Sequence, residues 1–209
     1  MNVLATNMLK LIPAAMLLFH AGTASAQSWF EYQNLDDLFS VNFPAEPVMS
    51  ESPYISEYDS PFVARKYSAT DGQTEYVVTV VNMENSARPP GRRGTEWRGA
   101  IGFHATKIRQ TGEVTFDAYG EINVMPGHQL QITQPDGRRN FANIHFHAHR
   151  LYVIEAISPP DLPPPALFQA SFSVIDAEGN SLRYNDSDYS FPDRVPLARR
   201  GGVTLPGQQ

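Results

Sequence analysis

The chain contains no cysteine, and this absence removes several structural and chemical options. Without cysteine there is no disulfide framework, no thiolate metal ligand and no cysteine nucleophile. There is also no cysteine side chain to which a lipid could be attached. Any fold must therefore be held together by its core and its hydrogen bonds.

Apolar runs of the ~20 residues that a bilayer-spanning helix needs are also missing. The apolar run at residues 11–19 has nine residues and contains Pro13. Lys10 precedes this run, and the small-residue sequence Ala24-Ser25-Ala26 follows it, which is the layout of a secretory signal peptide. We therefore predict a signal peptide over residues 1–26 rather than a membrane anchor. A cysteine-free exported domain suits a bacterial periplasm or exterior.

A surplus of positive charge is missing as well. Removal of residues 1–26 leaves 183 residues with 22 acidic and 15 basic side chains, so the formal charge is −7 with neutral histidines. A net negative protein has no general attraction for nucleic acid or anionic lipid. A chain of this length can bury the core of one domain without metal or disulfide cross-links.

Catalytic and nucleotide-binding signatures are missing too. The chain has no Gly-x-Ser-x-Gly turn, no His-Glu-x-x-His motif and no Gly-x-x-x-x-Gly-Lys-Ser/Thr loop. Glu113, Asp117 and Glu121 alternate on a predicted strand, but a solvated strand face explains these acids better than a catalytic carboxylate pair. We therefore expect neither enzyme activity nor a cofactor.

The chain does contain many β-strand patterns. In residues 39–47 (FSVNFPAEP), apolar and polar side chains alternate until the prolines end the run. Residues 63–69 and 75–83 flank an Asp-Gly pair, which predicts a hairpin. The second of these runs is almost continuously apolar and β-branched, as is typical of a central strand.

One amphipathic helix is predicted after the loop at residues 86–94. Thr95 is suited to its N-cap, and Gly112 to the glycine position after its C-terminus. The side chains of one helical stripe are Trp97, Ile101, His104, Ala105 and Ile108.

The second half predicts further strands and a second helix. The strands are expected at residues 114–124 with a bulge at Gly120, and at 128–133, 140–148 and 151–157, with turns at Pro126-Gly127, Pro135-Asp136-Gly137 and His149-Arg150. A helix is expected at residues 165–172. The order of elements indicates an α+β fold, with helices packed on an antiparallel sheet, in one domain over residues 27–175. Residues 176–209 are polar and predict a partly disordered tail.

Several segments between residues 39 and 173 resemble the PsbP-like α/β/α sandwich family. They are the F-x-V-x-F-P-x-x-P run at residues 39–47, the alternating Tyr76, Val78 and Val80, the middle helix, HRLYVIEA at 149–156 and ALFQASF at 166–172. The resemblance implies a small antiparallel sheet with helices on it and an accessory or partner-binding role. It supplies no catalytic residues.

Three histidines are the best candidates for a metal site. His145 and His147 are alternate residues of one predicted strand and share a face, about 6.5 to 7 Å apart. Two such imidazoles can bind zinc or copper, and His128 on the preceding strand would supply a third ligand. Alternatively, Ile144 and Phe146 take the core face, and the histidines point outward or against a covering loop. We favour this alternative, because no Asp, Glu or Cys ligand accompanies the cluster.

Two other groups of side chains leave alternatives open. Arginines gather before and at the start of the predicted helix: Arg88, Arg92, Arg93 and Arg98. They would hold an anion at the helix N-terminus, or simply lie in a solvated loop, which is the simpler interpretation. Four tyrosines form the other group: Tyr54, Tyr58, Tyr67 and Tyr76. They would line a ligand groove, or lie at core edges with their hydroxyls in water, which we favour.

Three functional hypotheses follow from these observations. The first is a non-catalytic exported accessory domain that binds another envelope protein or a small ligand through an apolar pocket or patch without converging polar groups. The second is an exported metal-binding protein in which His145 and His147 meet at one ion. The third is an enzyme whose cleft contains perturbed titrating groups from distant parts of the chain.

Native mass spectrometry of the untagged protein, purified from the compartment to which it is exported, tests the export and metal predictions. We expect the mass of the bare chain beginning near Gln27, because signal peptidase cleaves after A-x-A sequences. A mass that retains residues 1–26 would contradict the export prediction. An added zinc or copper ion, lost on substitution of His147, would favour the metal-binding hypothesis.

Overall fold

A computed structural model describes residues 29–84, 96–122 and 125–182. These residues form ten strands and two helices. In chain order, the elements are β1 (Phe30–Asn34), β2 (Phe39–Phe43), β3 (Val48–Ile55), β4 (Pro61–Asp71), β5 (Thr74–Asn82), α1 (Glu96–Arg109), β6 (Glu113–Ile122), β7 (Met125–Thr133), β8 (Arg139–His147), β9 (Arg150–Ser158), α2 (Ala166–Ser171) and β10 (Ser173–Val174).

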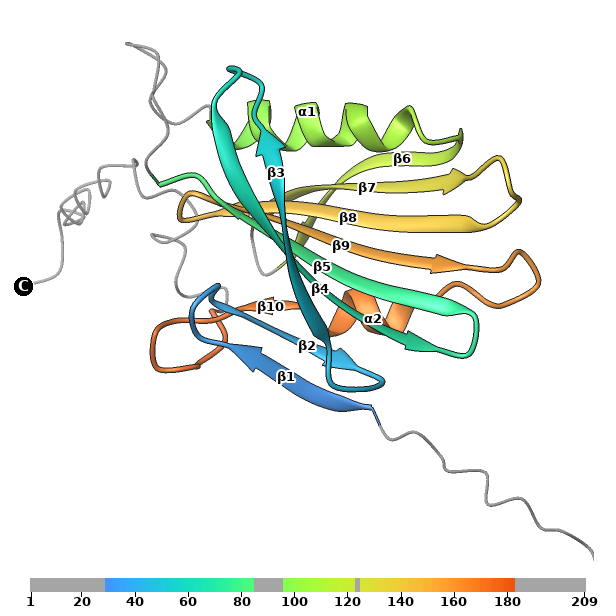
Figure 1. Ribbon diagram of the computed structural model, residues 1–209, viewed down its shortest axis with the longest axis horizontal. Coiled ribbons are helices and arrows are strands. Elements are labelled where there is room, and N and C mark those ends of the chain that lie inside the picture. Colours follow the sequence, from blue (N-terminus) through green and yellow to red (C-terminus); the bar gives the residue numbers. More distant parts are fainter. Residues whose placement is uncertain (1–28, 85–95, 123–124, 183–209) are drawn as a thin grey trace, which may run out of the picture.

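The strands form two antiparallel sheets, which Figure 1 shows as separate layers. The large sheet has the order β3-β4-β5-β9-β8-β7-β6, and the small sheet has the order β1-β2-β10. Helix α1 packs on β7 and β8, and α2 packs between β2 and β9. The predicted α+β fold, an antiparallel sheet with helices packed on it, is confirmed.

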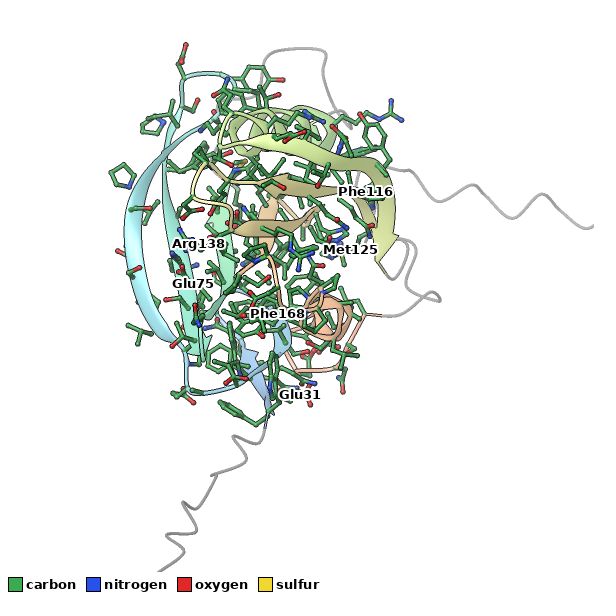
Figure 2. All side chains as sticks on the ribbon, turned by 90° about the vertical axis from the view of Figure 1, so that its right-hand side faces the viewer. Glu31, Glu75, Phe116, Met125, Arg138 and Phe168 are labelled. Atoms are coloured by element: carbon green, nitrogen blue, oxygen red, sulfur yellow. The ribbon has the colours of Figure 1, made fainter. Side chains whose placement is uncertain are left out.

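The large sheet divides the core into two clusters, because alternate residues of a strand point to opposite faces. On β9, Leu151 and Val153 belong to the cluster under α1, whereas Tyr152 and Ile154 belong to the cluster under the small sheet and α2. Figure 2 shows side chains filling the space on both sides of the sheet, with Phe168 well inside. Coverage on both faces explains why the sequence of β9 is almost continuously apolar.

The predicted hairpin and its central strand are confirmed. Strands β4 and β5 pair from Asp71 opposite Thr74, and Gly72 in the turn has a φ of +57°, which glycine adopts without strain. Strand β5 lies between β4 and β9. Both faces of β5 are buried, since Val78 and Val81 are fully enclosed on opposite sides of the sheet.

The predicted amphipathic helix is confirmed as α1, although the role predicted for Gly112 is wrong. Ile101, Ala105 and Ile108 are buried against the large sheet as expected. Thr95, the predicted N-cap, lies outside the described residues. Gly112 does not have the positive φ of a cap glycine; instead, a Cβ there would lie 2.2 Å from the carbonyl oxygen of Thr133. Glycine is needed here for close packing between the helix end and β7.

Several turns and one bulge lie elsewhere than predicted. Pro126 and Gly127 are in the first part of β7, where a proline near a strand start is tolerated. The register shift of β6 occurs between Val114 and Phe116 rather than at Gly120. The last hairpin turns at Ala148 and His149, with φ values of +44° and +62°. Positive φ at both central residues suits the right-handed twist of a two-residue hairpin.

Strand β3 was not predicted, because its sequence, VMSESPYI, mixes polar residues with a proline. Those residues suit its position at the edge of the large sheet, where proline and charge discourage further strand pairing. No helix among the described residues is long and apolar enough to cross a membrane.

At the C-terminal side, the predicted second helix is confirmed within a residue as α2. Ordered structure continues beyond residue 175, since Ile175 bridges to Ser181 and Leu182 packs against the cluster under the small sheet. The predicted signal peptide and the tail after Leu182 lie outside the described residues.

Asp37, in the turn between β1 and β2, connects the small sheet to the large one. Its carboxylate is fully buried and accepts hydrogen bonds from the Arg65 guanidinium and, at 2.5 Å, from the Tyr67 hydroxyl. Arg65 and Tyr67 both belong to β4. The Tyr152 hydroxyl on β9 donates to the backbone carbonyl of Asp37 at 3.0 Å. One turn is thereby bonded to two strands of the opposite layer.

Replacement of Asp37 by alanine is expected to lower the free energy of unfolding by about 3 kcal/mol, because Arg65 and Tyr67 lose a buried charged acceptor. The neighbouring Asp36 is exposed and provides a matched control. Asp36→Ala should change the free energy by no more than about 0.5 kcal/mol. Urea denaturation measures both variants, and similar losses in the two would contradict the proposed role of Asp37.

Candidate functional site

The three candidate metal-binding histidines are divided between the two faces of the large sheet. In the pairing of β7 with β8, Gly127 lies opposite His145, and His128 lies opposite Ile144. Residues directly opposite each other share a face, and adjacent residues do not. His128 therefore points toward α1, whereas His145 and His147 point toward the small sheet. The prediction that His128 completes a site with the other two is corrected by this register.

His145 and His147 are interior side chains rather than outward-facing ones. His145 is fully buried, and its ring stacks on Phe172 with centroids 6.3 Å apart. A Cβ at residue 127 would lie 2.3 Å from Nδ1 of His145, so Gly127 leaves the space that the imidazole occupies. In the arrangement that we favoured, the core position of Ile144 and Phe146 is correct, but His145 and His147 do not face outward, because β8 is covered on both faces. Within the described part of the chain, no three His, Asp or Glu side chains are grouped to hold a metal ion.

His128 takes part in an ion-pair cluster with Asp117 and Arg109. The Arg109 guanidinium donates to both carboxylate oxygens of Asp117, at 2.7 and 3.2 Å, and His128 Nε2 also contacts that carboxylate. Hydrogen bonds from Arg109 and then from His128 lower the pKa of Asp117 to about 2. Asp117 is thus a structural ion-pair partner that ties the end of α1 to β6 and β7, rather than a freely solvated acid.

The arginine and tyrosine candidates have different outcomes. Arg88, Arg92 and Arg93 lie outside the described residues, so neither the solvated loop that we favoured nor an anion site is tested there. Arg98 places its guanidinium over the Trp97 ring, 4.8 Å from the centroid. Tyr54, Tyr67 and Tyr76 are buried, whereas Tyr58 is 38% exposed. Tyr76 is the one of these four that lines a sizeable hollow.

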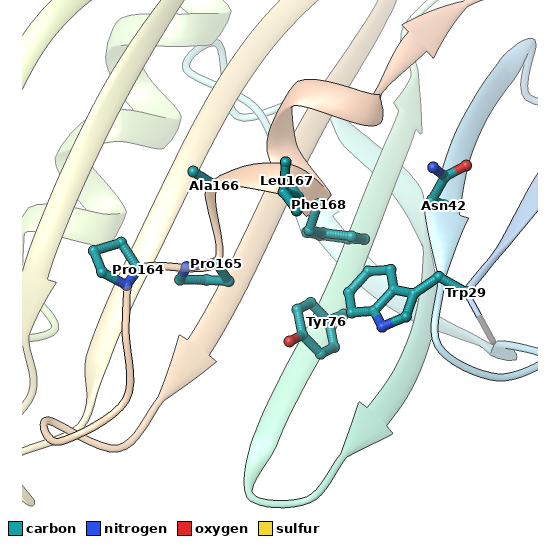
Figure 3. A pocket seen from close by; sticks show the side chains of 8 residues that line it. All are labelled: Trp29, Asn42, Tyr76, Pro164, Pro165, Ala166, Leu167 and Phe168. Carbon is teal, nitrogen blue, oxygen red and sulfur yellow. The ribbon is translucent and has the colours of Figure 1, made fainter. Parts of the chain in front are cut away.

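This hollow has a volume of about 330 Å³ and lies where the start of the small sheet, β5 and α2 come together (Figure 3). Its lining residues are Trp29, Asn42, Tyr76, Pro164, Pro165, Ala166, Leu167 and Phe168. No Asp, Glu, His, Lys or Arg is among them. We define these eight residues as the aromatic hollow.

Three rings in mutual contact form the aromatic part of the hollow. Trp29 meets Tyr76 edge to face, with centroids 4.8 Å apart and planes at 82°. Tyr76 meets Phe168 at 5.0 Å and 62°. Figure 3 shows these rings gathered together, with Pro164 and Pro165 standing to one side. Steep angles between neighbouring rings are a favourable arrangement of aromatic quadrupoles.

The local sequence explains how the walls are placed. Pro164 and Pro165 lead into α2, where prolines suit the first turn of a helix. Within the short helix, Phe168 turns inward and packs on Phe43 with centroids 5.4 Å apart. Leu167 consequently points outward and is 86% exposed. Trp29, directly before β1, is 37% exposed.

The polar groups of the hollow are few. Burial, helped by the Asp71 carboxylate, raises the pKa of Tyr76, so its phenol stays protonated at neutral pH. The backbone N–H of Asn42 donates to Ser171 Oγ at 3.0 Å, while its side chain is left at the surface. This lining can bind apolar groups and donate hydrogen bonds, but it offers no side chain that exchanges protons near pH 7.

Sequence reasoning considered Tyr76 for a groove but missed the other lining residues. Trp29 carried no functional prediction, and residues 165–168 were expected only as the first part of a helix. Two signals were available: an isolated tryptophan before the first strand, and a cluster of prolines followed by Leu167 and Phe168. Their proximity depends on the pairing of β5 with β9 and the position of α2 on β2, which no local pattern reveals.

Two comparisons with known proteins give no match, and a third gives a similar solved structure. No family model matches the chain, and no curated protein matches it. The solution structure of cyanobacterial PsbP (CyanoP) from Synechocystis sp. PCC 6803 is similar, with 15% identity and a TM-score of 0.46 over 75% of this chain and 98% of that chain.

The buried histidines are expected to make the fold sensitive to acid. Burial lowers the pKa of His104, His145 and His147 to about 4 each, from 6.5 for an ordinary histidine. Because the folded protein favours the neutral imidazole, this contribution to stability is complete above pH 6.5 and is lost as the pH falls from 6.5 toward 4.

Urea denaturation between pH 7 and pH 4.5 should show stability falling by up to about 1.4 kcal/mol per pH unit for each such histidine. The slope should be shallower in His145→Gln and His147→Gln, since each variant removes one group that takes up a proton on unfolding. A stability that does not change between pH 7 and pH 4.5 would show that these histidines are not held neutral by the fold.

Proposed function

We propose that this protein is an exported binding domain without catalytic activity, and that the aromatic hollow is its ligand-binding surface. The observation that carries the proposal is the composition of the hollow: three aromatic rings, two prolines and an exposed leucine, with no ionisable side chain except a protonated tyrosine. An apolar concavity with few polar groups is the usual form of a site that binds small molecules or peptides.

The exposure of Trp29 and Leu167 supports a binding role. Both are large apolar side chains. Trp29 is partly exposed to water and Leu167 almost fully, whereas Phe168 in the same region is buried. Covering them with a ligand would remove apolar area from water, at roughly 25 cal/mol per Å². Partly exposed aromatic side chains of this kind often contribute most of the affinity in protein interfaces.

The rigidity of the surroundings supports the same role. Phe168 and Tyr76 belong to one buried cluster that includes β2, β5 and β9. The rings therefore keep their relative positions before a ligand arrives, which reduces the conformational entropy lost on binding. An accessory role, as the PsbP-like sequence resemblance implies, agrees with a preformed surface that binds and does not transform its ligand.

Four soluble probes of different classes test this proposal: indole, octyl glucoside, a chitin trisaccharide and a proline-containing peptide. Two-dimensional amide NMR spectra should show saturable shifts at residues 29, 42, 76 and 166–168 with at least one probe. Trp29→Ala should weaken that binding at least tenfold, because a contact with an aromatic anchor is lost.

Leu162→Ala provides the matched control, since Leu162 is 38% exposed, similar to Trp29, but does not line the hollow. It should leave the affinity unchanged. Shifts confined to another surface, or no binding of any probe, would contradict the proposal. Chemical conversion of a probe by the protein would contradict the absence of catalysis.

A further inference from the structure

The chemical class of the ligand can be inferred from the hollow, on the basis of the function proposed above. The planes of Trp29 and Tyr76 cross at 82°, and those of Tyr76 and Phe168 at 62°. Rings in contact at such angles form a continuous aromatic surface. Aromatic-lined grooves of this type suit the polyproline II helix, whose fixed backbone loses little entropy on binding and presents pyrrolidine rings to aromatic side chains.

Hydrogen-bond donors at the hollow also fit a polyproline II segment. Such a segment makes no internal hydrogen bonds, so its backbone carbonyls need outside donors. The Trp29 indole N–H and the Asn42 side-chain amide have no hydrogen-bond partner among the described residues, and both belong to the lining. Tryptophan can only donate, and the asparagine amide has two donor hydrogens. Both groups are therefore available to two carbonyls of an extended ligand.

The charges around the hollow favour a basic ligand. Glu31 lies directly across β1 and β2 from Asn42, and the Asp71 carboxylate is close enough to raise the pKa of Tyr76. Neither acid forms an ion pair with a described residue, in contrast to Glu75, which is paired with Lys66 at 2.9 Å. Among the described residues, no Lys, Arg or His lines the hollow, and none is adjacent in sequence to a lining residue. Glu31 and Asp71 therefore favour positive side chains in a ligand, in the same sense as the net charge of the whole chain.

A small quaternary cation alone fits the geometry less well. An aromatic site for such a cation places rings around it, with the charge over their faces. Here Trp29 and Tyr76 touch each other at 4.8 Å, so they form a continuous surface rather than an enclosure. A longer ligand can contact the whole hollow, because it lies across the surface and places its cations beside Glu31 and Asp71.

We propose that the aromatic hollow binds a basic, proline-containing segment of a partner protein in the polyproline II conformation. Its pyrrolidine rings pack on Trp29 and Leu167, the exposed apolar side chains of the lining. Its carbonyls accept from Trp29 and Asn42, and its cationic side chains lie toward Glu31 and Asp71. This is one specific use of the binding surface proposed above.

Fluorescence titration tests the inference, because the chain has two tryptophans and Trp97→Phe leaves Trp29 as the reporter. The probes are nine-residue peptides of three repeats: Pro-Pro-Arg, Pro-Pro-Glu and Ala-Ala-Arg. Tetramethylammonium is the fourth probe. We expect saturable binding of the Pro-Pro-Arg peptide, at least tenfold tighter than that of any other probe. Added salt should weaken this binding, since exposed charges contribute to it.

A charge substitution in the protein gives a second measurement. Glu31→Gln should weaken binding of the Pro-Pro-Arg peptide about threefold and reduce its salt dependence, because one acidic partner is removed. Glu113→Gln is the matched control, as Glu113 is an exposed acid on β6 at the far edge of the large sheet. It should have no effect.

Each contrary result overturns a defined part of the inference. Equal binding of the Ala-Ala-Arg peptide would exclude recognition of the polyproline II conformation, and equal binding of the Pro-Pro-Glu peptide would exclude recognition of charge. Tighter binding of tetramethylammonium would indicate a small-cation site instead. If no peptide binds but indole or octyl glucoside still shifts the hollow residues in NMR spectra, the inference fails while the proposed function stands.

Discussion

The central strands of the large sheet are apolar on both faces, and the rest of the fold follows from the need to cover both. Helix α1 covers one face over β7 and β8. The small sheet and α2 cover the other, where Phe39, Phe43 and Phe168 complete the buried cluster. Asp37 fixes the small sheet in place through β4 and β9. The second layer ends near Tyr76, and at this end Trp29 and the residues leading into α2 meet around an incompletely filled space, the aromatic hollow.

Coverage on both faces also determines the environment of the histidines. An alternating strand on a half-exposed sheet would present His145 and His147 to water, where a metal ion could reach them. In this sandwich they are enclosed, and the low pKa that follows from burial keeps them neutral in the folded state. Because residue 127 is glycine, the imidazole of His145 has room to pack against β7 as a core side chain. Because these histidines are enclosed, their protonation destabilises the folded state.

Local patterns in the sequence were sufficient for most elements of the fold. Alternation in β2, the Asp-Gly turn before β5 and the helical stripe of α1 each depend on neighbours a few residues apart. Strand β3 was missed because edge strands need polar residues and prolines that weaken the pattern. The predicted orientation of the histidines was wrong because it depends on which strands are covered by a second layer. The hollow was missed for a similar reason, since Trp29, Tyr76 and Phe168 are brought together by packing across the whole chain.

Site-specific photo-crosslinking in living cells tests the central claim most directly, namely that the aromatic hollow is where this protein meets its ligand. A photoreactive phenylalanine analogue would replace Leu167, which is 86% exposed at the hollow, and in a second strain Tyr119, which is 81% exposed on β6. We expect a discrete covalent adduct from position 167 and none from position 119. An adduct from position 119 alone, equal adducts from both positions, or none from position 167 would contradict the account.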